Sequence, residues 1–266
     1  MFRNGGSNMK VVILAGGMGT RISEESHLKP KPMIEIGGHP ILWHIMKIYS
    51  SYGYNDFIIC CGYMGHVIKE YFLDYYMYQS DITIDLASND VQVHETITEP
   101  WKVTLVNTGL YTSTAGRIKQ IQKYVGDEPF MMTYGDGVAD VDIAALIDFH
   151  KKQGKAVTIT TTRPAGRFGV LQMDDKAGLV RSFKEKGKED QSWVNAGFAV
   201  FNKEIFDYLG DGSDMLEQST YEHLAQDGQM AAYKHTGFWS PMDTMRDKNY
   251  LEELWQSGNA KWKIWN

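Results

Sequence analysis

A glycine-rich segment near the start of the chain combines residue types that can bind phosphate. Gly16, Gly17 and Gly19 follow residues 11–14, an apolar and mostly β-branched run that predicts a buried strand. A glycine turn after a strand lets backbone N–H groups approach an anion closely, because no Cβ stands in the way. Arg21 would add a planar, permanently charged group to the same site. The glycines are also compatible with a tight turn that binds nothing.

A basic segment with two prolines lies close behind this loop and reads Lys29-Pro30-Lys31-Pro32-Met33. Because proline fixes φ, we expect the segment to be extended and stiff, with its lysines held near the glycines. A solvated charge run would not need that rigidity, so the segment favours a binding role. The glycine spacing is neither the dinucleotide fingerprint G-x-G-x-x-G nor a P-loop, since no G-K-[ST] follows.

Two aspartates are candidate metal ligands. Asp136 lies between two glycines and follows a short buried strand predicted at residues 130–134. Ligands of open α/β sheets bind at the carboxyl ends of strands, so this carboxylate is well placed for a metal. An aspartate that stabilises its own turn gives the same pattern. Asp243 precedes the last predicted helix, and from the residues alone it is expected to be the N-cap of that helix.

The elements that must position these residues alternate along the chain. Strands at residues 11–14 and 56–61 and helices at 41–52 and 66–72 predict parallel βαβ units. Further strands are predicted at residues 81–87, 103–106, 130–134, 156–162, 194–201 and 230–235. Further helices are predicted at residues 115–125, 142–152, 219–226 and 247–255, and a hairpin at 170–184.

These elements predict one α/β domain over residues 9–266, with a mixed, mostly parallel sheet flanked by helices and a β-rich second half. Residues 1–8 lack the apolar core of an export signal, so no such signal is expected. We expect these residues to form a disordered extension.

Composition excludes several function classes. The net charge of −6 argues against nucleic acid or an anionic membrane as the main partner, and no apolar run reaches transmembrane length. Cys60 and Cys61 are adjacent in an apolar run, so neither a disulfide framework nor a zinc site is supported. We expect them to be reduced core residues of a cytoplasmic protein. The absence of H-E-x-x-H and G-x-S-x-G gives no support to zinc-protease or serine-hydrolase chemistry.

The glycine loop and the basic segment together resemble the signature of the sugar-1-phosphate nucleotidylyltransferases. The resemblance covers residues 14–21 and 29–38 and continues through 40–46, 57–63, 99–101, 133–139, 166–169 and 237–243. It implies a Rossmann-like fold of the nucleotide-diphospho-sugar transferase type. The later stretches point to CTP and α-D-glucose 1-phosphate as substrates, and to CDP-glucose and pyrophosphate as products. In this reaction the sugar phosphate oxygen attacks the α-phosphorus, which requires in-line positioning and charge neutralisation.

Site residues follow from this resemblance, position by position. It implies that Arg21, Lys31 and Asp136 are catalytic and that Asp136 and Asp243 hold Mg²⁺. The implied nucleotide-binding residues are Leu14, Ala15, Gly16, Gly17, Gly19, Thr20, Arg21, Lys31, Asn107, Thr108, Gly109, Thr112, Arg117 and Gly135. The implied sugar phosphate-binding residues are Gly169, Glu185, Lys186 and Asn195. Arg117 is equally compatible with an ordinary helix-surface arginine, and Lys29 is expected to be a solvated neighbour.

The resemblance places the base pocket at Asn107, Thr108, Gly109 and Thr112. Base selection is expected in that pocket, because phosphate-binding groups cannot distinguish bases. We therefore expect CTP to be preferred over UTP and dTTP. Two departures from the family pattern, Gly187 for proline and Ala196 for glycine, bear on sugar specificity rather than on reaction class.

The resemblance also implies a cytoplasmic homo-oligomer, expected to be a hexamer, that serves lipopolysaccharide O-antigen biosynthesis. The aromatic-rich residues 71–78 and 255–265 are too apolar to face water alone, so they form a subunit interface or cap the monomer's own core. Two other functions stay open: a uridylyl- or thymidylyltransferase of the same fold, and a non-catalytic nucleotide-sugar sensor. Retention of Arg21, Lys31, Asp136 and Asp243 argues against the sensor. The glycine spacing disfavours a nicotinamide oxidoreductase.

Overall fold

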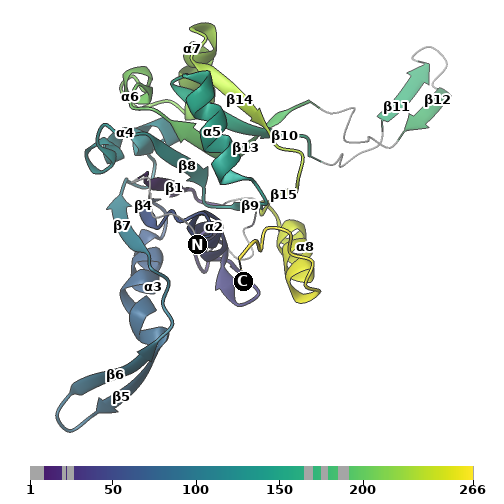
Figure 1. Ribbon diagram of the computed structural model, residues 1–266. Coiled ribbons are helices and arrows are strands. Elements are labelled where there is room, and N and C mark those ends of the chain that lie inside the picture. Colours follow the sequence, from purple (N-terminus) through teal and green to yellow (C-terminus); the bar gives the residue numbers. More distant parts are fainter. Residues whose placement is uncertain are drawn as a thin grey trace.

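A seven-stranded mixed sheet forms the centre of the fold in the computed structural model, which describes residues 9–19, 22, 27–164, 170–174, 179–184 and 192–265 (Figure 1). Of residues 170–174 and 179–184 only the backbone is described. The strands run in the order β14 (Met230–Lys234), β10 (Val157–Thr162), β13 (Val194–Phe201), β8 (Phe130–Tyr134), β1 (Val11–Ala15), β4 (Asp56–Cys61) and β7 (Lys102–Asn107).

All strand pairings in this sheet are parallel except those of β13, which runs antiparallel to both β8 and β10. The expected mixed, mostly parallel sheet is therefore confirmed. The extension expected at residues 1–8 lies outside the described residues and stays a prediction.

Strand β1 is buried along its whole length because helices cover both faces of the sheet. Val11 and Ile13 pack in one apolar cluster with α2 (Ile41–Ser50). Val12 and Leu14 pack in a second cluster on the opposite face, with α4 (Thr114–Val125). This two-sided burial explains why the strand reads as a continuous apolar run, and it fixes the glycine loop at the carboxyl end of a central strand.

The remaining helices are α3 (Gly65–Tyr78), α5 (Ile143–Gln153), α6 (Ile205–Tyr208), α7 (Tyr221–Gln226) and α8 (Met245–Gln256). A 3-10 turn, η2 (Lys31–Met33), follows the glycine loop, and a π-helical turn, η4 (Leu216–Thr220), precedes α7. Among the residues described, each helix is too short or too polar to cross a lipid bilayer.

Two local expectations were wrong. The basic segment is not extended throughout: Pro30 is extended, but Lys31–Met33 form the 3-10 turn, because the φ of Pro32 also suits the first turn of a helix. Asp243 is not the N-cap of α8. Thr244 is the N-cap, and its side chain and that of Asp247 form a reciprocal capping box.

Four two-stranded ribbons complete the fold. They are β2 (Glu35–Ile36) with β3 (His39–Pro40), β5 (Ser80–Asp85) with β6 (Asp90–Thr96), β9 (Gly137–Ala139) with β15 (Trp239–Pro241), and β11 (Val170–Asp174) with β12 (Leu179–Lys184). The last is the expected hairpin, which is confirmed. Helix α3 and the β5–β6 hairpin together form an arm that projects away from the sheet (Figure 1).

The C-terminal segment packs on the chain's own core. Trp262 is 1% exposed and donates a hydrogen bond from Nε1 to Nδ1 of the buried His44 on α2. Of the two expectations for residues 255–265, core capping is therefore the one that Trp262 satisfies. Cys60 and Cys61 are buried free thiols, as expected.

Candidate active site

The β9–β15 ribbon brings two distant carboxylates together. Asp136 directly precedes β9, Asp243 lies two residues after the end of β15, and Gly137 pairs with Pro241. The N–H of Met242 donates to the carbonyl oxygen of Asp136, at 2.7 Å, which extends this pairing to the site. The backbone thereby fixes the separation of two residues that lie far apart in the sequence.

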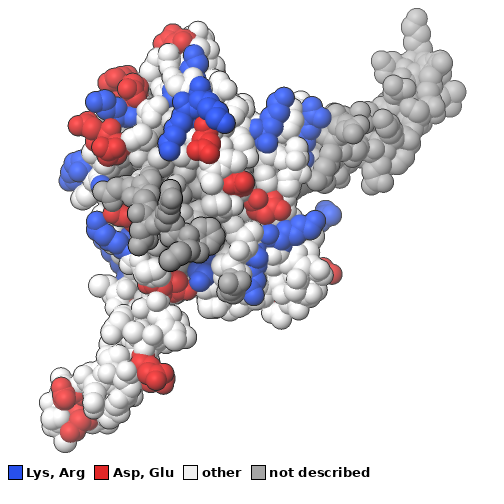
Figure 2. Space-filling model, viewed as in Figure 1, with Lys and Arg blue, Asp and Glu red and all other residues white. Residues whose placement is uncertain are grey.

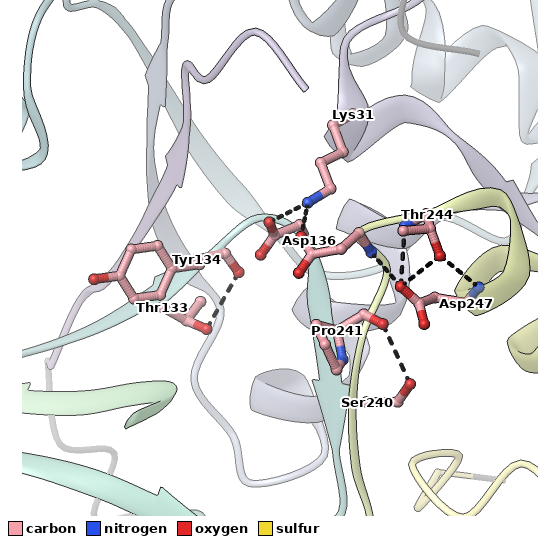
Figure 3. Close-up of polar contacts among 9 residues, drawn as sticks. Lys31, Thr133, Tyr134, Asp136, Ser240, Pro241, Thr244 and Asp247 are labelled. Atoms are coloured by element: carbon pink, nitrogen blue, oxygen red, sulfur yellow. Dashed lines mark hydrogen bonds and ion pairs between the residues drawn. The ribbon is translucent and has the colours of Figure 1, made fainter. Parts of the chain in front are cut away.

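Lys31 lies between these carboxylates. Its Nζ is 2.6 Å from Oδ2 of Asp136 and 2.7 Å from Oδ1 of Asp243 (Figure 3). Lys31 is 7% exposed, whereas the side chains of Asp136 and Asp243 are 33% and 18% exposed. The cluster carries one ammonium against two carboxylates, so it retains one negative charge, and both carboxylates are partly exposed. Its three residues are those that the sequence predicted for phosphate and metal binding.

Arg117 is buried against the glycine loop and is not a surface arginine. It is 5% exposed and donates to the carbonyl oxygen of Gly16 at 3.1 Å, to Oγ1 of Thr108 at 2.6 Å and to the carbonyl oxygen of Gly109 at 2.9 Å. A Cβ at Gly16 would lie 2.1 Å from Nη1 of Arg117. The alternative of a helix-surface arginine is therefore wrong, and the close packing of Arg117 favours a glycine at position 16.

Two cavities meet at Asp136. The first, here called the loop cavity, has a volume of about 360 Å³ and lies over the glycine loop. It is lined by Leu14, Ala15, Gly16, Gly17, Gly19, Lys31, Pro32, Thr112, Thr114, Arg117, Tyr134, Gly135, Asp136, Met215 and Glu217. The second, the strand cavity, has a volume of about 280 Å³ and lies over β13. It is lined by Thr133, Tyr134, Asp136, Gly137, Asn195, Ala196, Gly197, Phe198, Trp239, Pro241 and Asp243. Tyr134 and Asp136 line both cavities.

Most of the described residues that the sequence predicted for this site line these two cavities. The exceptions are Asn107, Thr108 and Gly109. Asn107 is exposed and accepts a hydrogen bond from the Gly109 N–H, and Thr108 is buried behind Arg117. Thr112 alone of the four predicted base-pocket residues lines the loop cavity. The predicted residues Thr20, Arg21, Gly169, Glu185 and Lys186 lie outside the described residues.

Sequence reasoning missed the pair formed by Tyr134 and Glu217. The Tyr134 hydroxyl donates to Oε1 of Glu217, and Oγ1 of Thr114 donates to Oε2 of Glu217 at 2.9 Å. Burial first, and then neighbouring groups that include Glu217, raise the pKa of the Tyr134 hydroxyl, so it remains a donor. Tyr134 stands two residues before Asp136, and that position was the one available signal. Glu217 carried none.

Ala196, one of the two departures from the family pattern, fits the strand cavity without disturbing it. Its carbonyl oxygen accepts a hydrogen bond of 2.7 Å from Nε1 of Trp239. The adjacent Gly197 has φ +83°, and a Cβ there would lie 2.8 Å from Cδ2 of Tyr134. The glycine that this irregular stretch of β13 requires is therefore Gly197.

The sequence model of the nucleotidyl transferase family matches residues 10–253. The chain belongs to the nucleotidyl transferase family. Two relatives of this nucleotidyl transferase are the glucose-1-phosphate cytidylyltransferases of Salmonella typhimurium (strain LT2) and Salmonella typhi. Each is 57% identical to it over 258 residues, which cover 97% of this chain and 100% of the relative.

A solved structure of UDP-glucose pyrophosphorylase with bound UDP-glucose superimposes on this nucleotidyl transferase with a TM-score of 0.67. The two chains are 15% identical, and the alignment covers 95% of this chain and 100% of the other. At that identity the likeness shows a common fold, and it agrees with the Rossmann-like fold that the sequence predicted.

Proposed function

We propose that this nucleotidyl transferase transfers the cytidylyl group of CTP to α-D-glucose 1-phosphate and releases CDP-glucose and pyrophosphate. The 57% identity to glucose-1-phosphate cytidylyltransferases over their full length supports this choice of substrates. The single structural observation that carries the proposal is the junction of two cavities at Asp136, beside Lys31.

Two substrates can meet at this junction. The loop cavity takes the nucleotide and the strand cavity takes the sugar phosphate, so the reacting phosphates lie at the residues that both cavities share. A sugar phosphate oxygen attacks the α-phosphorus of CTP from the strand cavity, and pyrophosphate leaves from the opposite side. No protein nucleophile is needed, since holding the two groups in line removes much of the barrier. Lys31 neutralises charge on the phosphates.

Asp136 and Asp243 are the residues that would hold Mg²⁺. Their carboxylates already converge on one cation, the Lys31 ammonium, and two carboxylates with space for phosphate oxygens suit the coordination of Mg²⁺. Bound there, the ion would draw negative charge from the phosphates. The binding of Mg²⁺ is part of the proposal.

We further propose that the enzyme is a cytoplasmic homo-oligomer, and specifically a hexamer. The two buried free thiols support a reducing compartment. The arm supports assembly, because Leu73, Tyr78 and Leu86 on it are each more than 70% exposed.

The proposed reaction is tested by measuring pyrophosphate release from CTP, UTP, dTTP, ATP and GTP, each with glucose 1-phosphate. We expect CTP to give the highest kcat/KM and the nucleotide sugar to have the mass of CDP-glucose. Pyrophosphate release that is fastest with UTP or dTTP would instead identify a uridylyl- or thymidylyltransferase, and no release with any triphosphate would favour a sensor.

A further inference from the structure

The loop cavity has two chemically different ends. One end contains Lys31 and Asp136, where the phosphates are expected. The other end lies at the start of α4 and contains Thr112, Thr114 and Glu217. The Tyr134 side chain connects them. Tyr134 is two residues from Asp136, its ring points away from Lys31 (Figure 3), and its hydroxyl donates to Glu217. Because the base and the triphosphate are opposite ends of a nucleotide, the base occupies the α4 end.

Glu217 is held in one orientation at this end. Its two carboxylate oxygens accept from the hydroxyls of Tyr134 and Thr114, and Thr114 in turn accepts from the N–H of Leu216 at 2.8 Å. A carboxylate offers about four acceptor positions, and these two hydrogen bonds use two of them. Glu217 is exposed to the cavity, so it keeps acceptor capacity for a ligand.

The other polar groups at this end are already engaged. The Thr112 hydroxyl donates to the carbonyl oxygen of Thr108, and the Arg117 guanidinium donates to the carbonyl oxygens of Gly16 and Gly109. Met215 adds an apolar surface. Among the described residues that line this end, Glu217 is the charged acceptor that is open to the cavity.

We infer that Glu217 selects the base by accepting a hydrogen bond from the exocyclic amino group of cytosine. Uracil and thymine carry a carbonyl oxygen at the same ring position. That oxygen would face the carboxylate with no proton between them, which leaves both groups unsatisfied. The inference rests on the proposed function, since it assumes that the enzyme uses CTP. It moves base selection from the predicted residues Asn107, Thr108, Gly109 and Thr112 to a residue on η4.

Glu217→Gln tests the inference, because the amide keeps the size of the side chain but can donate to a carbonyl oxygen. We expect the ratio of kcat/KM for CTP to that for UTP to fall at least tenfold, mainly through a gain with UTP. Glu222→Gln is the matched control: it removes the same charge from an exposed residue on α7 outside both cavities, and its ratio should stay at the wild-type value.

Calorimetric titration of the wild type and of Glu217→Gln with CDP and with UDP gives a second readout that does not depend on turnover. We expect the preference for CDP to fall at least tenfold as well. A binding preference within threefold of the wild-type value, or loss of binding of both nucleotides, would give Glu217 a structural role and overturn the inference. A wild type that itself prefers UTP would contradict the proposed function instead, so the two failures are distinguishable.

Discussion

Lys31 is a buried cation whose two partners are the proposed metal ligands. Its ammonium is 2.6 and 2.7 Å from the two carboxylates, so each carboxylate serves both to hold the lysine and to attract further positive charge. Replacing either aspartate by asparagine removes the charge and keeps the shape of the side chain. The amide oxygen can still accept a hydrogen bond from Lys31, so the substitution tests the role of the charge.

Asp136→Asn and Asp243→Asn are therefore each expected to lower kcat by about 10²-fold or more while the fold stays intact. The measurement is steady-state turnover at saturating Mg²⁺, with circular dichroism to check folding. Asp148→Asn, an exposed residue on α5, is the control and should keep full activity. A folded Asp136→Asn enzyme with near-normal turnover would contradict the metal assignment.

Among the secondary-structure elements, helix α8 connects the segment that carries Asp243 with the turn that follows Lys31. It begins directly after Asp243 and Thr244, and its Glu252 accepts from the N–H of Gly37 at 2.8 Å. Trp255 on the same helix lies against Gly37, in the turn that follows the Lys31 segment. The position of α8 thus affects the spacing of Lys31 and Asp243.

Two neighbouring glycines give a matched test of this link. Gly37 has φ +59° and a Cβ there would lie 1.9 Å from Nε1 of Trp255, whereas Gly38 has φ +78° and open space around its Cβ position. Gly37→Ala should lower the free energy of unfolding by about 1–3 kcal/mol more than Gly38→Ala does, because of the clash, and should also reduce kcat. Equal losses of stability and activity in the two variants, measured by urea unfolding and by turnover, would argue against the link.

The burial of His44 predicts a pH dependence of stability. Burial lowers the pKa of His44 to about 4, against about 6.5 for the unfolded chain. The unfolded state therefore binds more protons between these values, so this contribution to stability is complete above pH 6.5 and is lost as pH falls toward 4. Between pH 7 and pH 5 the wild type should lose about 2 kcal/mol more than His44→Leu in urea unfolding. Equal losses in the two proteins would contradict this.

The sequence predicted most elements because their signals are local. Periodicity gave β4 and β8 at their observed bounds, and Asp142 was recognised as the start of α5, which it caps through the N–H of Ala145. Asp243 was mistaken for an N-cap because it stands beside Thr244 and both residue types cap helices.

The rest of the site depends on contacts between distant segments. Arg117 is buried because it bonds to the carbonyl of Gly16, 101 residues away, and Glu217 meets Tyr134 across 83 residues. No local sequence pattern contains such pairings. Asp136 and Asp243 were predicted because they lie in stretches that resemble the family, and Glu217 lies outside those stretches. The antiparallel placement of β13 is likewise a property of the whole sheet.

At the scale of the whole molecule, the arm is the feature that bears on assembly. Residues 80–96 contain four acidic residues and no Lys or Arg, and Figure 2 shows acidic and uncharged surface along the visible face of the hairpin. Leu73 on α3 is 77% exposed, which is costly for a large apolar side chain that has no partner.

Light scattering at micromolar concentration should therefore give a mass several times that of the 30.2 kDa chain, with six copies expected. Leu73→Asp should lower this mass, because it places a charge in the interface. Leu28→Asp changes a similarly exposed leucine outside the arm and should leave the mass unchanged. A monomeric mass for the wild-type protein would reject the assembly.

The proposed function is the synthesis of CDP-glucose. The most direct measurement is a competition in which CTP, UTP and dTTP are present at equal concentration with α-D-glucose 1-phosphate and Mg²⁺, and the nucleotide sugars are identified by mass. We expect CDP-glucose to be the dominant product. Dominant UDP-glucose or dTDP-glucose would contradict it.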